Sequence, residues 1–288
     1  MSFSISRQNN PFRPTVNVVL EFLLEQFKHG KSDNSGLGYS AVSTARSAVS
    51  AIAMIDGQPA GQHILVRRFM KSVFNKRPAL PRYNTTWDPD VVLAYIKNMG
   101  PNKNLSLLQL SKKLTILLLL LSGQRCQTVQ HLDITHMTMT RSKVSFRITT
   151  LLKTSRPGHH QPDLVFPEYT PDRRLCVITT LKEYLHRTSA IRGDNTKLLL
   201  TTRLPVRPAS RATISRWTKS VMCDAGIDMN IFSTHSTRSA ATSRAAAHLP
   251  LNTIIRTIGW ANTSIFAKFY KKPIACPDAF SNVLLQNH

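Results

Sequence analysis

A histidine and an arginine stand three residues apart in the segment Phe232-Ser-Thr-His-Ser-Thr-Arg-Ser-Ala-Ala. Ser233 or Thr234 can cap a helix that begins here, and because residues three apart share a helix face, His235 and Arg238 would point together at its start. A helix N-terminus attracts phosphate, arginine binds it through two N–H groups, and histidine can move a proton near neutral pH. The pattern predicts an anion site with a titratable neighbour. An ordinary surface pair on a helix of small residues explains it equally well.

Two further cations lie at the ends of predicted elements. Arg125 follows Gly123, which ends a strongly apolar helix, and Lys153 lies in the turn of a predicted hairpin. An arginine that caps the carbonyl groups of the preceding helix is the usual reading, and a turn lysine is usually solvated. Neither residue indicates chemistry on its own.

A tyrosine near the C-terminus has unusual neighbours. Tyr270 ends a short helical segment that follows Gly259 and Trp260. By default such a tyrosine belongs to the core. The lysines that flank it are Lys268, Lys271 and Lys272. Their positive charges suit a phenolate or a phosphate better than an apolar interior.

The whole chain is strongly basic. Its 288 residues include 38 Lys and Arg against 15 Asp and Glu, which gives a formal net charge of +23 and a pI near 10.6. Basic residues exceed acidic ones in the first 80 residues and in the rest, so the charge is not confined to a tail. Such an excess favours a polyanion, and nucleic acid is the predicted partner.

Apolar and cysteine patterns argue against other classes. The longest apolar run, Leu114–Leu121, falls well short of the ~20 residues that a membrane span needs, and we find no secretory signal or lipidation motif. We therefore expect an intracellular protein with no membrane partner. The four cysteines are dispersed, and neither they nor the ten histidines have the spacing of a metal site or a disulfide framework. We expect neither a metal nor a cofactor.

The first third of the chain predicts three amphipathic helices, because apolar residues recur at helical spacing. Two of them span Val16–Phe27 and Tyr39–Met54. The third, at about 63–75, would turn Leu65, Phe69 and Val73 inward and leave a cationic outer face. The candidate DNA-binding residues are Arg46, Arg67, Arg68 and Lys71 in this part and Lys268 near the C-terminus.

A linker over 76–87 precedes a second domain, because its prolines block a helix and its polar residues give no core pattern. In that domain the helix Leu105–Leu121 is apolar nearly all round and would form the core. Alternation over Val144–Ile148, resumed at Leu164–Phe166, predicts an antiparallel hairpin or three-stranded sheet. Further helices are predicted at 91–98, 175–186, 211–225, 237–247 and 251–258.

Taken together, these candidate residues resemble the catalytic set of the tyrosine recombinase family, which includes the phage integrases, in order, spacing and predicted elements. The set is Arg125, Lys153, His235-x-x-Arg238, Trp260 and Tyr270. The amino-acid sequences of these motifs are most similar to those in recombinases of eukaryotic DIRS-like and Ngaro retrotransposons and of Cryptons. The resemblance implies a mainly α fold with a small antiparallel β-sheet, in which two domains form a C-shaped clamp. It implies a helical, SAM-like core-binding domain over 1–75, a linker over 76–87 and an α+β catalytic domain with a C-terminal helix over 88–288.

The resemblance also implies the chemistry of the nucleophile. Tyr270 would attack the scissile phosphate and form a 3′-phosphotyrosine, which conserves the energy of the phosphodiester so that rejoining needs no ATP. Arg125 and Arg238 would hold the phosphate oxygens and neutralise the charge that develops on them. Site-specific recombination or integration of mobile-element DNA, without metal, is the implied activity.

The remaining residues receive supporting roles from the same resemblance. Lys153 would protonate the departing 5′-oxygen, and His235 would assist proton transfer at the nucleophile. Trp260 would contact the phosphate or support the site. The implied partners are double-stranded DNA and further copies of the chain, as a dimer or tetramer on DNA, and the implied location is the nucleus.

The sequence departs from the family pattern at two places. Thr128 stands three residues after Arg125, where many members carry an acidic residue that orients the arginine, so another group must hold Arg125. The step from Trp260 to Tyr270 is one residue longer than the commonest spacing.

Two other functions remain compatible with the sequence. An inactive, element-derived DNA-binding protein is the main alternative, and a type IB topoisomerase is less favoured. The tail Pro277–His288 would dock as a helix on a neighbouring subunit or pack against its own chain.

Overall fold

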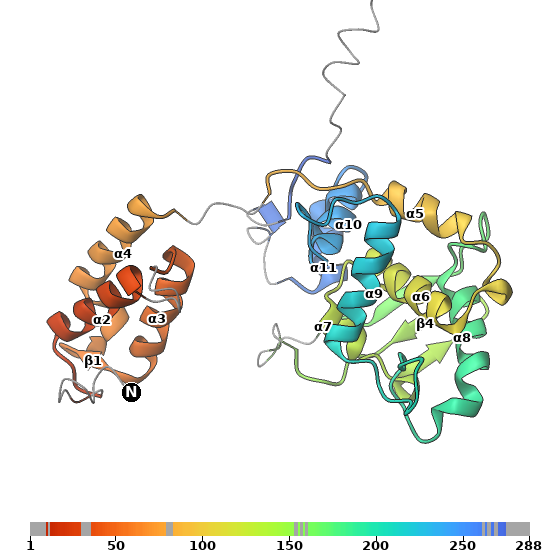
Figure 1. The fold of residues 1–288 in the computed structure, drawn as a ribbon, viewed down its shortest axis with the longest axis horizontal. Helices are drawn as coiled ribbons and strands as arrows, with labels where there is room; N and C mark the ends of the chain where they lie inside the picture. The colour runs from red at the N-terminus through yellow and green to blue at the C-terminus, as the bar shows by residue number, and fades with distance from the viewer. Residues whose placement is uncertain are drawn as a thin grey trace, which may run out of the picture. The chain divides into compact units, whose positions relative to one another are not determined.

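The computed structural model describes residues 10, 12–29, 36–78, 83–152, 155, 158, 161–260, 263, 266–267 and 270–274. The chain divides into two compact units, Met1–Arg82 and Tyr83–His288 (Figure 1). Each unit is mainly helical and carries a small antiparallel sheet. This confirms the predicted fold class, whereas the clamp and the domain roles stay predictions.

The first unit contains three helices, α2 (Val16–His29), α3 (Tyr39–Ile52) and α4 (Ile64–Lys76). A hairpin of two short strands, β1 (Met54–Ile55) and β2 (Gln58–Pro59), joins α3 to α4. Its two-residue strands are too short to leave an alternating pattern in the sequence. The helices bury one face each against a shared apolar cluster, as their spacing predicts.

The predicted inward face of α4 is confirmed for Val73 and wrong for Leu65 and Phe69. Val66, Met70 and Val73 are buried, whereas Leu65 is exposed and Phe69 is only half-buried. Apolar residues occur on several faces at the start of α4, so the sequence allows more than one apolar stripe. Packing selects the stripe of Val66, Met70 and Val73, whose spacings are four and three residues. The cations Arg67, Arg68 and Lys71 are exposed on this helix under either reading.

The second unit is built around α6 (Leu107–Ser122), which is buried along most of its length, as predicted. Ser106 and Gln109 form a capping box at its start. Helices α8 (Val177–Arg192), α9 (Arg211–Asp224) and α10 (Ser236–Ala246) pack against α6. The shorter helices are α5 (Pro89–Asn98), α7 (Cys126–Gln130) and α11 (Leu251–Ile258).

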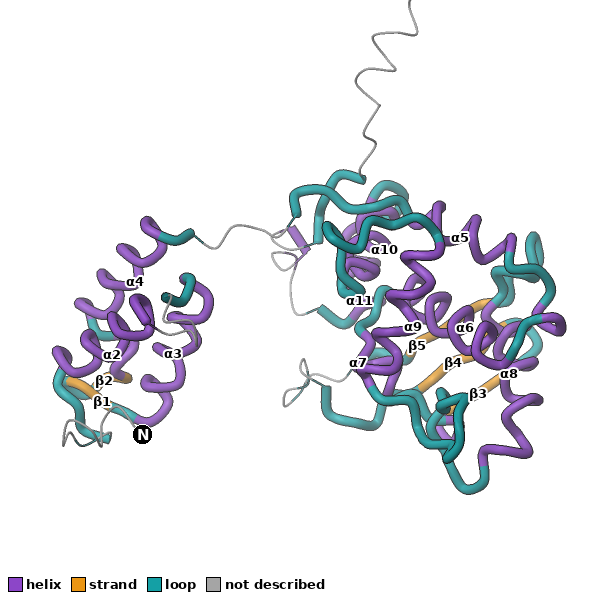
Figure 2. Tube along the Cα trace, in the orientation of Figure 1, coloured by secondary structure: helices purple, strands orange, loops and turns teal. Residues whose placement is uncertain are grey.

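The sheet of this unit has three antiparallel strands in the order β3 (Met137–Met139), β4 (Lys143–Phe146) and β5 (Leu164–Pro167), as Figure 2 shows. Val144 and Phe146 are buried on β4, and Leu164 and Phe166 are buried on β5, so alternate side chains face the core. This confirms the three-stranded form of the predicted sheet. Ile148 lies beyond the end of β4.

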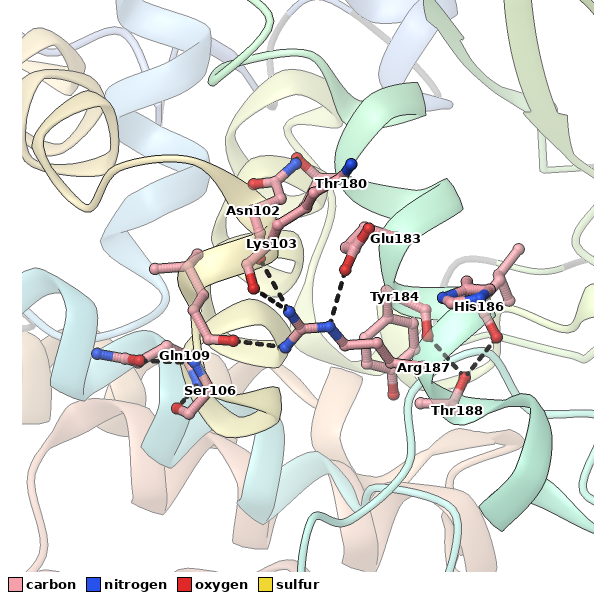
Figure 3. Close-up of polar contacts among 12 residues, drawn as sticks. Asn102, Lys103, Ser106, Gln109, Thr180, Glu183, Tyr184, His186, Arg187 and Thr188 are labelled. Carbon is pink, nitrogen blue, oxygen red and sulfur yellow. Dashed lines mark hydrogen bonds and ion pairs between the residues drawn. The ribbon is translucent and has the colours of Figure 1, made fainter.

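Helix α8 continues six residues past its predicted end at His186 because its polar residues serve structural roles. Arg187 Nε donates to Glu183 Oε1 (2.8 Å) in an ion pair, and the same guanidinium donates to the carbonyl groups of Lys103 and Leu105, just before α6 (Figure 3). Arg192 is buried and donates to the carbonyl of Leu198 (3.1 Å). In the sequence such a polar run resembles a helix end, but here its side chains satisfy backbone carbonyl groups, of which that of Leu198 is buried.

Candidate active site

Helix α10 brings His235 and Arg238 together, but its start differs from the prediction. The N-cap residue is His235, and no side chain caps the helix. The hydroxyl groups of Ser236 and Thr237 donate to the carbonyl groups of Ser233 and Thr234 instead. The predicted cap by Ser233 or Thr234 is therefore wrong, because the turn before α10 is already closed by these bonds.

A cavity of about 240 Å³ opens at this end of α10. Tyr270, Arg125, His235 and Arg238 all line it, although they come from segments far apart in the sequence. None of the described residues around it is acidic. The full lining is Tyr83, Gln124, Arg125, Cys126, Thr234, His235, Thr237, Arg238, Ser239 and Tyr270. A cavity with this lining suits an anion.

Arg238 is buried, yet part of its guanidinium has no partner. Its exposed fraction is 3%, and among the described residues nothing accepts a hydrogen bond from Nε or Nη1. Burial and the nearby charge of Arg125 lower the pKa of Arg238 to about 10, so it is still a cation at neutral pH. Buried donors without acceptors cost about 1–3 kcal/mol of stability. The arrangement is explained if an anion supplies the missing acceptors when it enters the cavity.

An aromatic stack lies beside the Arg238 guanidinium. The rings of Trp260 and Tyr270 stack with centroids 4.7 Å apart, and the Arg238 guanidinium lies 4.9 Å from the Trp260 ring and 5.4 Å from the Tyr270 ring. Trp260 Nε1 is buried and unpaired within the described part of the chain. Trp260 therefore fixes the plane of the tyrosine ring beside the arginine and brings a further free donor.

The turn that carries Arg125 is held against the end of α11. Gly123, with a φ of 60°, ends α6, and a side chain there would press on Ile258 Cδ1 at 3.0 Å. Gln124 Nε2 donates to the Ile258 carbonyl (3.1 Å), and Thr128 Oγ1 donates to Gln124 Oε1 (3.4 Å). Thr128, which replaces the acidic residue of the family pattern, thus orients the residue before Arg125.

The segment just before β5 reaches the same carbonyl group. Gln161 Nε2 donates to Ile258 O (3.2 Å), two residues before Trp260. A Cβ atom at Gly259 would lie 2.7 Å from Pro162 Cδ, and the φ of Gly259 is 75°. Three loops of the site therefore meet at the end of α11.

Replacing Gly259 with alanine should destabilise the protein more than the same change at Gly100. Both glycines have positive φ, which costs an alanine about 1–2 kcal/mol, but only Gly259 faces close neighbours, whereas no atom lies within 4 Å at Gly100. Overpacking at Pro162 should add about 1–3 kcal/mol to the loss for G259A. Urea unfolding of the two variants measures the difference, and equal losses would show that this junction is loosely packed.

The backbone around Tyr270 is fastened to α10 and to the first residues of the second unit. Ser243 Oγ donates to the Tyr270 carbonyl (2.7 Å) and accepts from Lys272 N (3.2 Å). Lys272 Nζ donates to the Tyr83 carbonyl. Thr86 N donates to Pro273 O (2.9 Å). Hydrogen bonds therefore hold the backbone of Tyr270 and of the residues that follow it.

His235 should titrate below the ordinary histidine range. Packing around the ring lowers the pKa of His235 below 6.5, even though the residue as a whole is exposed, and the positive charges of Arg125 and Arg211 lower it further. The neutral imidazole is therefore the main form at pH 7. Because the folded pKa lies below the unfolded one, the stability contribution of His235 is present above pH 6.5 and is lost as the pH falls through the folded pKa.

Removal of a neighbouring charge tests this cause. Arg211→Gln should raise the pKa of His235, whereas Arg216→Gln on the same helix should leave it unchanged. NMR titration of the His235 ring measures the pKa in both variants. An equal shift in both variants, or none in either, would contradict the electrostatic explanation.

Several predicted residues are not placed at the cavity. Lys153 and Lys268 lie outside the described residues, as does the tail after Ile274. Arg46 lies half-buried on α3 in the first unit, and the other candidate DNA-binding residues, Arg67, Arg68 and Lys71, are exposed on α4. The part of the chain that the structure covers contains no group of histidine, cysteine and carboxylate side chains suited to a metal ion. None of its helices is long and apolar enough to cross a membrane.

Sequence reasoning missed four residues that shape the site, namely Tyr83, Gln124, Gln161 and Ser243. Each acts through a contact with a residue distant in the sequence, such as Gln124 with Ile258, 134 positions away. Polar residues next to predicted catalytic ones, such as Gln124 beside Arg125, were the available signal. No spacing rule links Ser243 to Tyr270.

Comparison with known proteins gives the same class. The profile of the phage integrase family matches residues 88–274. The structure resembles the Tn1549 transposon integrase in complex with transposon right end DNA, with a TM-score of 0.54, 14% identity, and coverage of 94% of this chain and 85% of the other. A lambda integrase dimer bound to a COC′ core site gives a TM-score of 0.51, 16% identity, and coverage of 93% and 84%. The post-cleavage complex of XerH recombinase with a palindromic difH substrate gives a TM-score of 0.53 at 10% identity, with coverage of 94% of this chain and 77% of the other.

The fold is that of tyrosine recombinases. Because the family profile spans well over half of its length, the chain belongs to the phage integrase family, whose activity is site-specific cleavage and rejoining of DNA. Curated protein sequences gave no significant match.

Proposed function

We propose that this chain cuts and rejoins duplex DNA with Tyr270 as its nucleophile. One observation carries the proposal: the half-buried Tyr270 ring lies beside a buried arginine whose Nε and Nη1 atoms have no acceptor among the described residues. A scissile phosphate in the cavity would accept from Arg238 and from Arg125 while the tyrosine oxygen attacks it. The uncapped start of α10 would add backbone donors to the same group.

The reaction conserves the number of phosphoester bonds. The Tyr270 oxygen forms a bond to phosphorus, and the bond from phosphorus to the 5′-oxygen breaks, which leaves a 3′-phosphotyrosine. His235, neutral at pH 7, takes the phenol proton, and Lys153 gives a proton to the departing 5′-oxygen. In the second half the 5′-hydroxyl of a new strand attacks the phosphotyrosine and frees Tyr270. The energy of the broken ester is kept, so neither ATP nor metal is needed.

The first unit supplies further DNA contacts in this proposal. Arg67, Arg68 and Lys71 lie exposed on α4 and would bind the phosphate backbone together with Arg46, as the core-binding domain of a clamp. Lys268 would join them from the catalytic side. Because the lambda integrase neighbour is a dimer on its core site, we include self-association on DNA.

We also propose a mobile element as the source of the chain. Its motif wording resembles DIRS-like, Ngaro and Crypton recombinases, and a transposon integrase is among its structural neighbours. Action on chromosomal DNA would require residence in the nucleus, so a tagged protein found only in the cytoplasm would contradict that part.

A nicked-DNA experiment tests the proposed function. The full chain is incubated in EDTA and without ATP with a pool of nicked duplexes whose sequence is randomised around the nick, so that a cleaved strand is lost and the covalent complex accumulates. We expect an adduct that survives denaturing electrophoresis and enriches particular sequences. Salt-sensitive binding without any adduct would favour an inactive DNA-binding protein, and adducts with no sequence preference would favour a topoisomerase.

A further inference from the structure

The hydroxyl group of Ser243 bridges the backbone on both sides of Lys271. It donates to the Tyr270 carbonyl at 2.7 Å and accepts from the Lys272 amide at 3.2 Å. A serine hydroxyl has one donor and can accept in addition, so both bonds form at once. The bridge holds the chain immediately after the tyrosine in one conformation.

Ser243 also lies on the helix that carries the anion-binding arginine. It follows Arg238 by five residues on α10, and the packed backbone of that helix links the two positions rigidly. The bridge therefore fixes the Tyr270 segment to the same element that holds Arg238. A change in this bond would alter the distance between nucleophile and guanidinium without touching either side chain.

Lys272 adds a second attachment on the other side of the segment. Its ammonium group donates to the Tyr83 carbonyl and lies 4.2 Å from the centroid of the Tyr83 ring. That ring packs against Phe232 at 5.4 Å and lines the cavity. The Thr86 amide then holds Pro273 O. Two attachments to separate elements restrain the backbone after Tyr270 more than one does.

We propose that Ser243 and Lys272 are positioning residues that set the place of the Tyr270 oxygen relative to Arg238. The inference rests on the proposed function, in which Tyr270 is the nucleophile. Ser243 acts on the backbone next to Tyr270, and Lys272 acts on the carbonyl group and ring of Tyr83, so neither side chain needs to touch the phosphate. They should therefore affect the rate of strand cleavage and leave DNA affinity nearly unchanged, because a displacement of ~1 Å at a reacting group can cost about 100-fold in rate.

The neighbouring lysine gives a matched control. Sequence reasoning grouped Lys271 with Lys272 as flanking cations, but the structure places them differently, since Lys271 is exposed and Lys272 is half-buried. Thr257 is the control for Ser243, because its hydroxyl makes only a bond within α11 (to Thr253 O, 2.9 Å) on the exposed side. Each pair removes the same polar group, a hydroxyl or an ammonium, from a fastened and from an exposed position, and T257A removes a methyl group in addition.

The experiment measures single-turnover adduct formation on the nicked DNA pool for S243A, K272Q, T257A and K271Q in the full chain. We expect S243A and K272Q to be 10- to 100-fold slower than T257A and K271Q, with DNA dissociation constants within about twofold of the wild type. The conservative variants S243T and K272R keep the donors and should recover most of the rate. A rate for S243A and K272Q equal to that of the controls would overturn the inference, as would a fall in DNA affinity that matches the fall in rate.

A second measurement does not depend on catalysis. Fluorotyrosine placed at position 270 reports the surroundings of the ring by ¹⁹F NMR, and its signal should shift or broaden in S243A and K272Q and stay unchanged in T257A and K271Q. Unchanged signals in all four variants would overturn the inference even if the wild type formed no adduct. A wild type without adduct but with these shifts would instead count against the proposed function alone.

Discussion

Replacement of Tyr270 by phenylalanine should abolish covalent attachment to DNA and leave DNA binding intact. The change removes one oxygen atom, while the ring can keep its stack on Trp260 at 4.7 Å and its contact with Arg238. Loss of a nucleophile lowers the rate by about 10⁴-fold or more, because the phenylalanine ring has no oxygen atom that could form a bond to phosphorus. Adduct formation on nicked DNA and a binding titration at fixed salt give the two readouts.

Tyr83 is the matched control for this prediction, because it is the second tyrosine that lines the cavity. Y83F keeps the carbonyl group that Lys272 contacts and should keep adduct formation. If Y83F lost the adduct and Y270F kept it, the roles of the two tyrosines would be reversed and the account of the site would be wrong.

Replacement of Arg238 by methionine should lower cleavage strongly without lowering stability. The guanidinium has two unpaired, buried nitrogen atoms, so the unliganded protein bears an unfavourable desolvation that methionine removes. We expect the free energy of unfolding to stay the same or to rise by about 1–3 kcal/mol, since the lost contact with the Trp260 ring contributes only about 1 kcal/mol. The rate of adduct formation should fall by about 10²- to 10³-fold, as for the loss of one anion-binding donor.

Inorganic sulfate provides the control for the Arg238 prediction. A ligand that binds only the folded state stabilises it, so sulfate should raise the melting temperature of the wild type more than that of R238M. R216M, at an exposed position on α9, should respond like the wild type. A severe loss of stability in R238M together with normal cleavage would show that Arg238 is structural.

Local sequence patterns predicted the helices and strands and indicated the candidate catalytic residues. The apolar run of α6, the alternation in β4 and β5 and the stop at Gly259 each depend on residues close together in the chain, where periodicity and caps are informative. Four of the six candidate catalytic residues, Arg125, His235, Arg238 and Tyr270, line one cavity, and a fifth, Trp260, stacks on Tyr270.

The sequence could not reveal contacts between distant segments. The start of α10 was predicted to use a side-chain cap, but Trp87 Nε1, 149 residues away, donates to Ser236 Oγ, and Ser236 in turn bonds Ser233 O. The role of Thr128 depends on the contact of Gln124 with Ile258, which lies 134 residues further along the chain. Such bonds are selected by tertiary packing, and no local propensity encodes them.

The most direct test of the central claim is to identify the residue that carries DNA after the reaction. The adduct formed in EDTA is digested with nuclease and protease, and the modified peptide is sequenced by mass spectrometry. The account predicts a nucleotide joined through its 3′-phosphate to the oxygen of Tyr270. Attachment to any other residue, or through a 5′-phosphate, would contradict it.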